Sequence, residues 1–139
     1  MLESVRVIDV SSSIAGAYCA RLLADAGADV VHVEPPDGDP WRAWTVSGRP
    51  VDRERGGALF QFLHHGVRSV VGAPGDPAIE ELVAGADVVI DSCAPSDPRP
   101  EHWHAAHPGV VVCSITPYGR TGPYAERPTT EARYRAAPE

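Results

Sequence analysis

Three consecutive serines, Ser11, Ser12 and Ser13, are the residues of this sequence best placed to hold a small molecule. They follow the apolar run 5–10, and Gly16 comes directly after them in a segment with helical spacing. A short apolar run that ends in polar residues is typical of a buried strand. Backbone N–H groups at the start of the next helix can hold a nucleotide-like anion. An ordinary helix start without a ligand is the equally open alternative.

A second polar segment, residues 34–42, follows the apolar run 29–34. Ligands of α/β sheets bind just past the carboxyl ends of the strands, so both polar segments are expected at the ligand-binding edge. The sequence has no G-x-G-x-x-G after the first run and no Walker lysine motif. The usual dinucleotide and phosphate-loop fingerprints are therefore absent.

The histidines predict no metal centre. His104 and His107 can share one face of a helix, but no second ligand group with matching spacing accompanies them. A solvated helix is the better interpretation of this pair. His64 and His65 precede a glycine and are predicted to be helix-end residues, favoured there by the helix dipole.

The candidate nucleophiles also lack their usual surroundings. Ser69, Ser92 and Ser114 are not part of a G-x-S-x-G elbow. Cys93 and Cys113 lie at or near strand ends without a positive neighbour that would favour a thiolate, so they are expected to be small, buried apolar residues. No catalytic residue is predicted within the chain.

Isolated arginines stand beside predicted turns of an otherwise acidic chain. Arginine suits phosphate and carboxylate recognition, and a solvated surface position is the equally open alternative. The residues concerned are Arg42, Arg68 and Arg120.

The elements that must position these residues alternate along the chain. This order predicts an α/β fold, a doubly wound and mainly parallel sheet with helices on both faces. Asp76 and Pro77 form a typical helix start, and Gly27 a typical helix end. Strands are expected at 5–10, 29–34, 68–71, 87–92 and 110–115, and helices at 15–26, 58–63, 77–85 and 100–107.

Two segments fall outside this alternation. Residues 35–57 are rich in Pro, Gly, Asp and Arg, and a loop of this length is usually functional or disordered. Residues 125–139 form a charged tail that we expect to be a frayed helix. The predicted organisation is thus one domain, 1–124, followed by this tail.

The composition restricts the class of protein. The chain has 139 residues, of which 43% are hydrophobic, enough for the core of a single domain. Its net charge of −7 disfavours nucleic acid as a partner, and no apolar run approaches the length needed to span a membrane. Three well-separated cysteines favour a reducing compartment, the cytoplasm, over a disulfide framework.

Eight pieces of the sequence, in the same order, resemble the family III CoA-transferases. This is the carnitine/bile-acid CoA-transferase type, which includes the α-methylacyl-CoA racemases. One such piece would be weak evidence, whereas eight in register indicate common descent. The matching pieces are residues 6–11, 15–16, 22–30, 33–42, 68–70, 82–90, 113–116 and 118–124.

The resemblance implies a Rossmann-like domain that binds coenzyme A. It assigns CoA contacts to Ser12, Ser13, Ile14 and Ala15, and places Arg68 where the family has a basic residue near the CoA phosphates. The family reaction moves CoA between an acyl-CoA and a carboxylic acid through a carboxylate nucleophile. CoA or an acyl-CoA is therefore expected as a substrate, with no tightly bound cofactor and no metal.

The resemblance covers only the N-terminal portion of the family. Its catalytic aspartate lies beyond Glu139, and Thr130 stands where the racemase branch has its histidine, so we expect no activity from this chain alone. One hypothesis is a CoA-binding half-site whose catalytic part lies on a partner, in a hetero- or homodimer with a transferase-like chain. The alternatives are a non-catalytic structural or regulatory partner of a full-length transferase, and a truncated relic.

Overall fold

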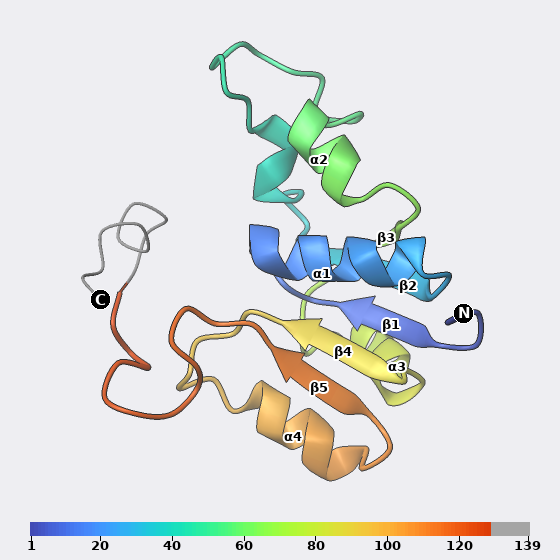
Figure 1. Ribbon diagram of the computed structural model, residues 1–139, viewed down its shortest axis with the longest axis vertical. Helices are drawn as coiled ribbons and strands as arrows, with labels where there is room; N and C mark the ends of the chain where they lie inside the picture. Colours follow the sequence, from blue (N-terminus) through green and yellow to red (C-terminus); the bar gives the residue numbers. More distant parts are fainter. Residues whose placement is uncertain (129–139) are drawn as a thin grey trace.

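A five-stranded parallel sheet forms the centre of the molecule, in the order β3-β2-β1-β4-β5 (Figure 1). The structure is a computed structural model that describes residues 1–128. The predicted α/β fold, a doubly wound parallel sheet, is confirmed. The strands are β1 (Arg6–Asp9), β2 (Asp29–Glu34), β3 (Arg68–Val71), β4 (Val88–Asp91) and β5 (Val111–Ser114).

Helices cover both faces of the sheet. Val7 and Ile8 are adjacent in β1 and point to opposite faces, as the pleat requires. Val7 packs in a cluster with Ala20 of α1, whereas Ile8 packs in another with Val83 of α3 and Trp103 of α4. The helices are α1 (Ile14–Asp25), α2 (Ala58–Leu63), α3 (Pro77–Ala84) and α4 (Arg99–Ala106), with a 3₁₀ helix η1 at Pro40–Ala43.

The chain reverses its direction across the sheet at β1. From β1 it proceeds outward to β2 and β3, and it then returns to the other side of β1 to build β4 and β5. Strands β2 and β4 both pair with β1, with Asp9 opposite His32 on one side and Ile90 on the other. The carboxyl ends of β1 and β4 therefore form the topological switch point, where open α/β sheets bind ligands.

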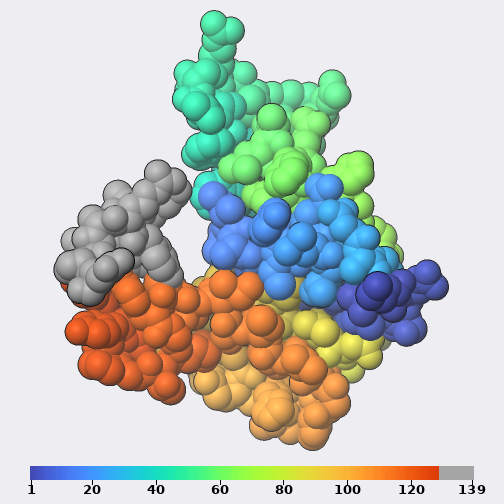
Figure 2. Space-filling model, in the orientation of Figure 1, coloured from blue at the N-terminus to red at the C-terminus, as the bar shows by residue number. Residues whose placement is uncertain are grey.

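The segment between β2 and α2 is more ordered than the predicted loop. It contains η1, which begins after Asp39, and the Asp39 carboxylate accepts a 2.6 Å hydrogen bond from the Trp41 N–H. Pro40 occupies the first position of this short helix, where a missing N–H costs nothing. Beyond η1 the segment projects from the body of the molecule (Figures 1 and 2).

Several expectations concern the end of the chain. Residues 129–139, with Thr130 and most of the predicted tail, lie outside the described residues. The division into 1–124 and 125–139 stays a prediction. Within residues 1–128, no helix is both long enough and apolar enough to cross a membrane.

Candidate functional site

The turns after β1 and β4 meet at the switch point. The N–H of Ser12, after β1, donates a 3.0 Å hydrogen bond to the Ser92 hydroxyl, after β4. Each turn is held by the aspartate that ends its strand. Asp9 accepts from the N–H of Ser11, and Asp91 accepts from the N–H of Cys93, both at 2.9 Å.

The N-terminus of α1 opens beside this junction. Ser13 caps the helix, because its hydroxyl accepts a 3.0 Å hydrogen bond from the Gly16 N–H. The N–H groups of Ile14 and Ala15 make no hydrogen bond within the described residues, as expected for the first turn of a helix. Ser12, Ile14 and Ala15 are also exposed. We call residues 12–15 together with Ser92 the switch-point surface; it offers two unpaired donors at the positive end of a helix dipole.

Gly16 lets the helix approach β1 closely. A Cβ at this position would lie 2.0 Å from the Ser11 hydroxyl oxygen. Any larger residue therefore displaces either the helix start or the turn after the strand. The glycine thus fixes where the free N–H groups of α1 lie.

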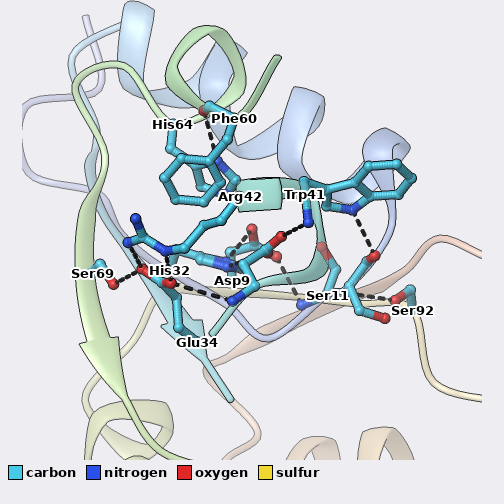
Figure 3. A network of polar contacts seen from close by, with 12 residues as sticks. Asp9, Ser11, His32, Glu34, Trp41, Arg42, Phe60, His64, Ser69 and Ser92 are labelled. Carbon is cyan, nitrogen blue, oxygen red and sulfur yellow. Dashed lines mark hydrogen bonds and ion pairs between the residues drawn. The ribbon is translucent and has the colours of Figure 1, made fainter. Parts of the chain in front are cut away.

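The η1 helix reaches the same turn from the other side. Trp41 donates a hydrogen bond from its indole nitrogen to the carbonyl of Ser12, at 3.0 Å (Figure 3). This contact ties the segment after β2 to the turn after β1. The carbonyl of Ser12 is consequently occupied, whereas the neighbouring N–H donors are not.

A cleft of about 490 Å³ lies over the carboxyl ends of β2 and β3. Its size is within the range typical of small-molecule sites. Arg53 is the one arginine of its lining without an ion pair among the described residues. We call this pocket the β2–β3 cleft; its lining is Glu34, Pro35, Pro36, Asp37, Gly38, Asp39, Arg42, Arg53, Glu54, Ser69 and Val71.

Arg42 and Glu34 form the floor of this cleft. Arg42 donates from Nε and Nη2 to the two carboxylate oxygens of Glu34, at 2.5 and 2.7 Å. These hydrogen bonds lower the pKa of Glu34 to about 2, against the opposing effect of burial, with a further contribution from the Ser69 hydroxyl. The guanidinium also lies 4.1 Å over the Phe60 ring and donates to the Glu54 carbonyl. Arg42 therefore holds the loop in place, and each of its three guanidinium nitrogens donates a hydrogen bond within the chain.

A buried histidine lies between the two turns and the cleft. His32 is 1% exposed, with Nδ1 3.1 Å from Asp9 and Nε2 3.0 Å from Asp39 (Figure 3). Burial lowers its pKa, but the hydrogen bonds to Asp39 and Asp9 outweigh burial and raise the pKa to about 9. The His64 ring lies 4.5 Å from the His32 ring, and burial and His32 lower its pKa. The His32 imidazolium thus connects Asp9, at the end of β1, to Asp39, directly before η1.

The comparison with known families decides what kind of protein this is. A family model described as CoA-transferase family III matches residues 2–137. The chain belongs to CoA-transferase family III. The predicted resemblance is therefore confirmed, and it extends over nearly the whole chain.

The chain is similar to two curated CoA-transferases over part of their length. Succinyl-CoA–D-citramalate CoA-transferase of Chloroflexus aurantiacus is 34% identical, with 91% of this chain and 33% of that protein covered. Succinate–glutarate CoA-transferase of Agrobacterium fabrum is 36% identical, with 90% and 34% covered. The chain spans about one third of the length of these relatives.

A solved structure shows the same fold. The crystal structure of a CAIB/BAIF family protein from Brucella suis matches with a TM-score of 0.79 at 36% identity. The match covers 91% of this chain and 36% of that one. The sheet described above is therefore the arrangement found in a member of this class of proteins.

The structure brings together four of the five CoA-contact residues predicted for this family III member. Ser12, Ser13, Ile14 and Ala15 are contiguous at the switch-point surface. Arg68 lies elsewhere, because it begins β3 and its guanidinium pairs with Asp29 at the amino end of β2, at 2.5 Å. The structure thus places Arg68 apart from the other four.

The buried network around His32 was not predicted from the sequence. The sequence held one sign of this network, a histidine inside the apolar run 29–34. Asp39 gave no sign, because only the fold of its loop brings it to His32. The helix-end position predicted for His64 is confirmed, since His64 is the C-cap residue directly after α2. Its predicted role was wrong, because burial lowers its pKa and its Nδ1 lies 3.1 Å from the Phe60 carbonyl.

The remaining predicted residues are accounted for by local contacts. Cys93 is half-buried, and burial together with Asp91 raises its pKa to about 11, so it is a neutral thiol. Arg120 binds Glu101 and the carbonyls of Ala94 and Asp97. Arginines 42, 68 and 120 therefore all recognise carboxylates of the chain itself.

Proposed function

We propose that this chain binds coenzyme A or an acyl-CoA at the switch-point surface. The observation that carries the proposal is the pair of N–H groups on Ile14 and Ala15 that are unpaired among the described residues; both are exposed residues at the switch point of a family III domain. Such N–H groups bind phosphate at a helix N-terminus, and CoA carries phosphates. Ser12 and Ser13 add hydroxyls to the same surface.

The β2–β3 cleft is the natural place for a second part of the ligand. Arg53 has no ion pair among the described residues, and it lines a cleft large enough for a nucleotide-sized group. We propose Arg53 as a phosphate contact. Arg68 stays in the proposal on the family resemblance alone, since its contact with Asp29 lies toward the other end of the strands.

For the whole protein we propose the transfer of CoA between an acyl-CoA and a carboxylic acid. Succinyl-CoA is the donor we propose to test first, because it appears in the names of several relatives. We assign no nucleophile to the described residues. Asp9 and Asp91, the aspartates at the switch point, are fully buried and held by hydrogen bonds.

Isothermal titration of CoA into the purified chain tests the proposal. The variant Ala15→Glu adds a negative charge at the second position of α1, where acidic residues stabilise a helix. We expect it to fold normally and to lower CoA affinity at least about tenfold, because like charges in contact are costly. Ala78→Glu is the matched control, since Ala78 is exposed at the second position of α3.

The variants Arg53→Gln and Arg68→Gln separate the two arginines. A loss of affinity in the first alone supports the cleft as part of the site. A loss in the second brings Arg68 into the site. A folded wild type that binds no CoA up to millimolar concentration, or equal loss in A15E and A78E, would contradict the proposal.

We also propose that the chain works in an assembly with a transferase-like chain. Relatives include proteins named as subunits, among them the succinyl-CoA–L-malate CoA-transferase beta subunit. Tyr18 and Phe62 stack on each other while about half exposed, and Leu22 is exposed beside them in α1. This apolar patch fits a hetero- or homodimer contact, whether the assembly is catalytic or regulatory. Light scattering with size-exclusion chromatography tests it, and a strictly monomeric chain that captures no transferase would contradict it.

We propose a reducing compartment, the cytoplasm, for this assembly. The cysteines at 19, 93 and 113 are all free. Free thiols persist in reducing compartments, whereas secreted domains form disulfides. Recovery of an intermolecular disulfide from freshly lysed cells would contradict this assignment.

A further inference from the structure

Three side chains with metal-binding atoms converge beneath the β2–β3 cleft. One ring nitrogen each of His32 and His64 and one carboxylate oxygen of Asp39 lie within 4.8 Å of one another. They come from β2, from the residue before η1 and from the end of α2. Segments far apart in sequence thus supply an N₂O donor set, which suits zinc and similar divalent metals.

Both histidines have their other ring nitrogen occupied in the manner of metal ligands. His32 Nδ1 lies 3.1 Å from the Asp9 carboxylate, and His64 Nδ1 lies 3.1 Å from the Phe60 carbonyl. Metal-binding histidines nearly always donate their second N–H to a carboxylate or a backbone carbonyl, which fixes the ring orientation. In both rings this leaves Nε2 for the metal.

His64 Nε2 is an independent sign that a group belongs here. It is a buried atom without any hydrogen-bond partner. The Phe60 carbonyl only accepts, so Nδ1 carries the proton and the neutral ring presents a lone pair at Nε2. A buried acceptor left unsatisfied is costly, and a metal ion would satisfy it.

The surroundings of His32 point the same way. Two carboxylates lie against its ring, Asp9 at Nδ1 and Asp39 at Nε2. All three residues are almost fully buried. Imidazole nitrogens and carboxylate oxygens are ligands that zinc takes in proteins. On metal binding, His32 Nε2 would coordinate as the neutral ring and release any proton to solvent, as is general for histidine ligands.

The spacing of the donors is compatible with such an ion. His32 Nε2 and Asp39 Oδ2 are 3.0 Å apart, and two ligands of a tetrahedral zinc are about 3.3 Å apart at bond lengths near 2.0 Å. The three donor atoms lie within 4.8 Å of one another, so an ion would draw His64 toward the other two. We propose that His32, Asp39 and His64 form a zinc-type site that fastens η1 and α2 to the sheet.

Metal titration of the chelator-treated chain tests this site. We expect one equivalent of Zn²⁺ to bind in calorimetry, no Mg²⁺ to bind, and Co²⁺ to give the visible absorption of a four-coordinate ion. His64→Asn should lower Zn²⁺ affinity more than about 100-fold, beyond the 10–100-fold typical of losing an outer hydrogen-bond partner. His65→Asn is the matched control, because His65 is the next residue and is exposed; we expect its affinity to stay within about twofold of the wild type.

Surface histidines need their own control. His104 on α4 is exposed, so His104→Asn should leave Zn²⁺ binding unchanged. The proposal is overturned if the wild type binds no Zn²⁺, if H65N or H104N loses as much affinity as H64N, or if Co²⁺ gives no four-coordinate spectrum. Should H64N fail to fold, His64→Gln replaces it, and the wild-type Co²⁺ spectrum decides independently of any variant.

Discussion

The ends of β1 and β4 are built alike and then diverge. Each strand ends in a fully buried aspartate, Asp9 or Asp91. Each carboxylate accepts the N–H two residues later, and each reaches sideways to the next strand outward. The outward partner of Asp9 is His32, whereas the partner of Asp91 is Ser114.

This difference in partner decides whether a further segment of the chain is held at each strand end. The Ser114 hydroxyl donates one 2.6 Å hydrogen bond to Asp91, and the pair is complete. His32 has a second nitrogen, which binds Asp39 and so draws η1 onto the sheet. Trp41 of η1 then contacts Ser12 in the turn after β1. His32, which has two ring nitrogens, therefore positions η1 beside the turn after β1. The Ser114 hydroxyl at the end of β5 positions no further segment of the described chain in this way.

Removing the outward partner at each end should give the largest contrast. His32→Ala leaves two buried carboxylates facing each other and should destabilise the fold by about 3–5 kcal/mol. Ser114→Ala removes a single hydrogen bond and should cost about 1–2 kcal/mol. Urea unfolding of both variants measures this. Equal losses would show that the two ends are energetically equivalent.

The β1 end should also respond to pH. His32, faced by Asp9, Asp39 and His64, has a folded pKa of about 9, above its unfolded value of about 6.5. Its contribution is therefore fully present below pH 6.5 and is lost as the pH rises through 9, to the extent of about 3 kcal/mol. Urea unfolding in chelator at several pH values tests this. This decrease in unfolding free energy at high pH should be absent from His32→Ala and should have its wild-type size in Ser114→Ala.

A glycine after β1 is tightly packed, whereas a glycine before β5 is not. After β1, Gly16 of α1 lies against Ser11, and an added Cβ would meet the serine oxygen at 2.0 Å. Gly16→Ala should cost about 1–3 kcal/mol through overpacking and should weaken CoA binding. Gly109, in the turn before β5, has no atom near an added Cβ. Gly109→Ala is the control, and stability losses of equal size would refute the close-approach argument.

The smallest effect concerns Cys93 in the turn after β4. Because its pKa is raised to about 11, its thiolate fraction at pH 8 should be roughly 100-fold below that of an ordinary cysteine. Iodoacetamide labelling followed by mass spectrometry should therefore be slow in the folded chain and fast in urea. Bound CoA should slow it further. Rapid labelling of the folded chain at pH 8 would contradict this prediction.

The sequence predicted the fold well because its signals are local. The strand ending at Glu34 and the helix beginning at Pro77 follow from apolar runs and capping residues alone. Ser12 to Ala15 were predicted together because they are contiguous. The His32 network was missed because it depends on strand register, which sets Asp9 opposite His32, and on the fold of a long loop that returns Asp39 to the same place.

Arg68 illustrates the limit in the other direction. The resemblance to the family predicts a CoA contact for Arg68 from its place in the sequence, but the place in the sequence does not show which charged group the side chain meets. Here the carboxylate of Asp29 decides its direction. The sequence pattern predicts strand β3, but only the register of β3 against β2 shows which charged residue the Arg68 side chain can reach.

Nuclear magnetic resonance of ¹⁵N-labelled protein during a CoA titration tests the central claim most directly, because it observes the unpaired N–H groups themselves. We expect the amide signals of Ile14 and Ala15 to shift as CoA binds, while that of Ala78 at the start of α3 does not. Shifts confined to other parts of the chain, or none up to millimolar CoA, would contradict it.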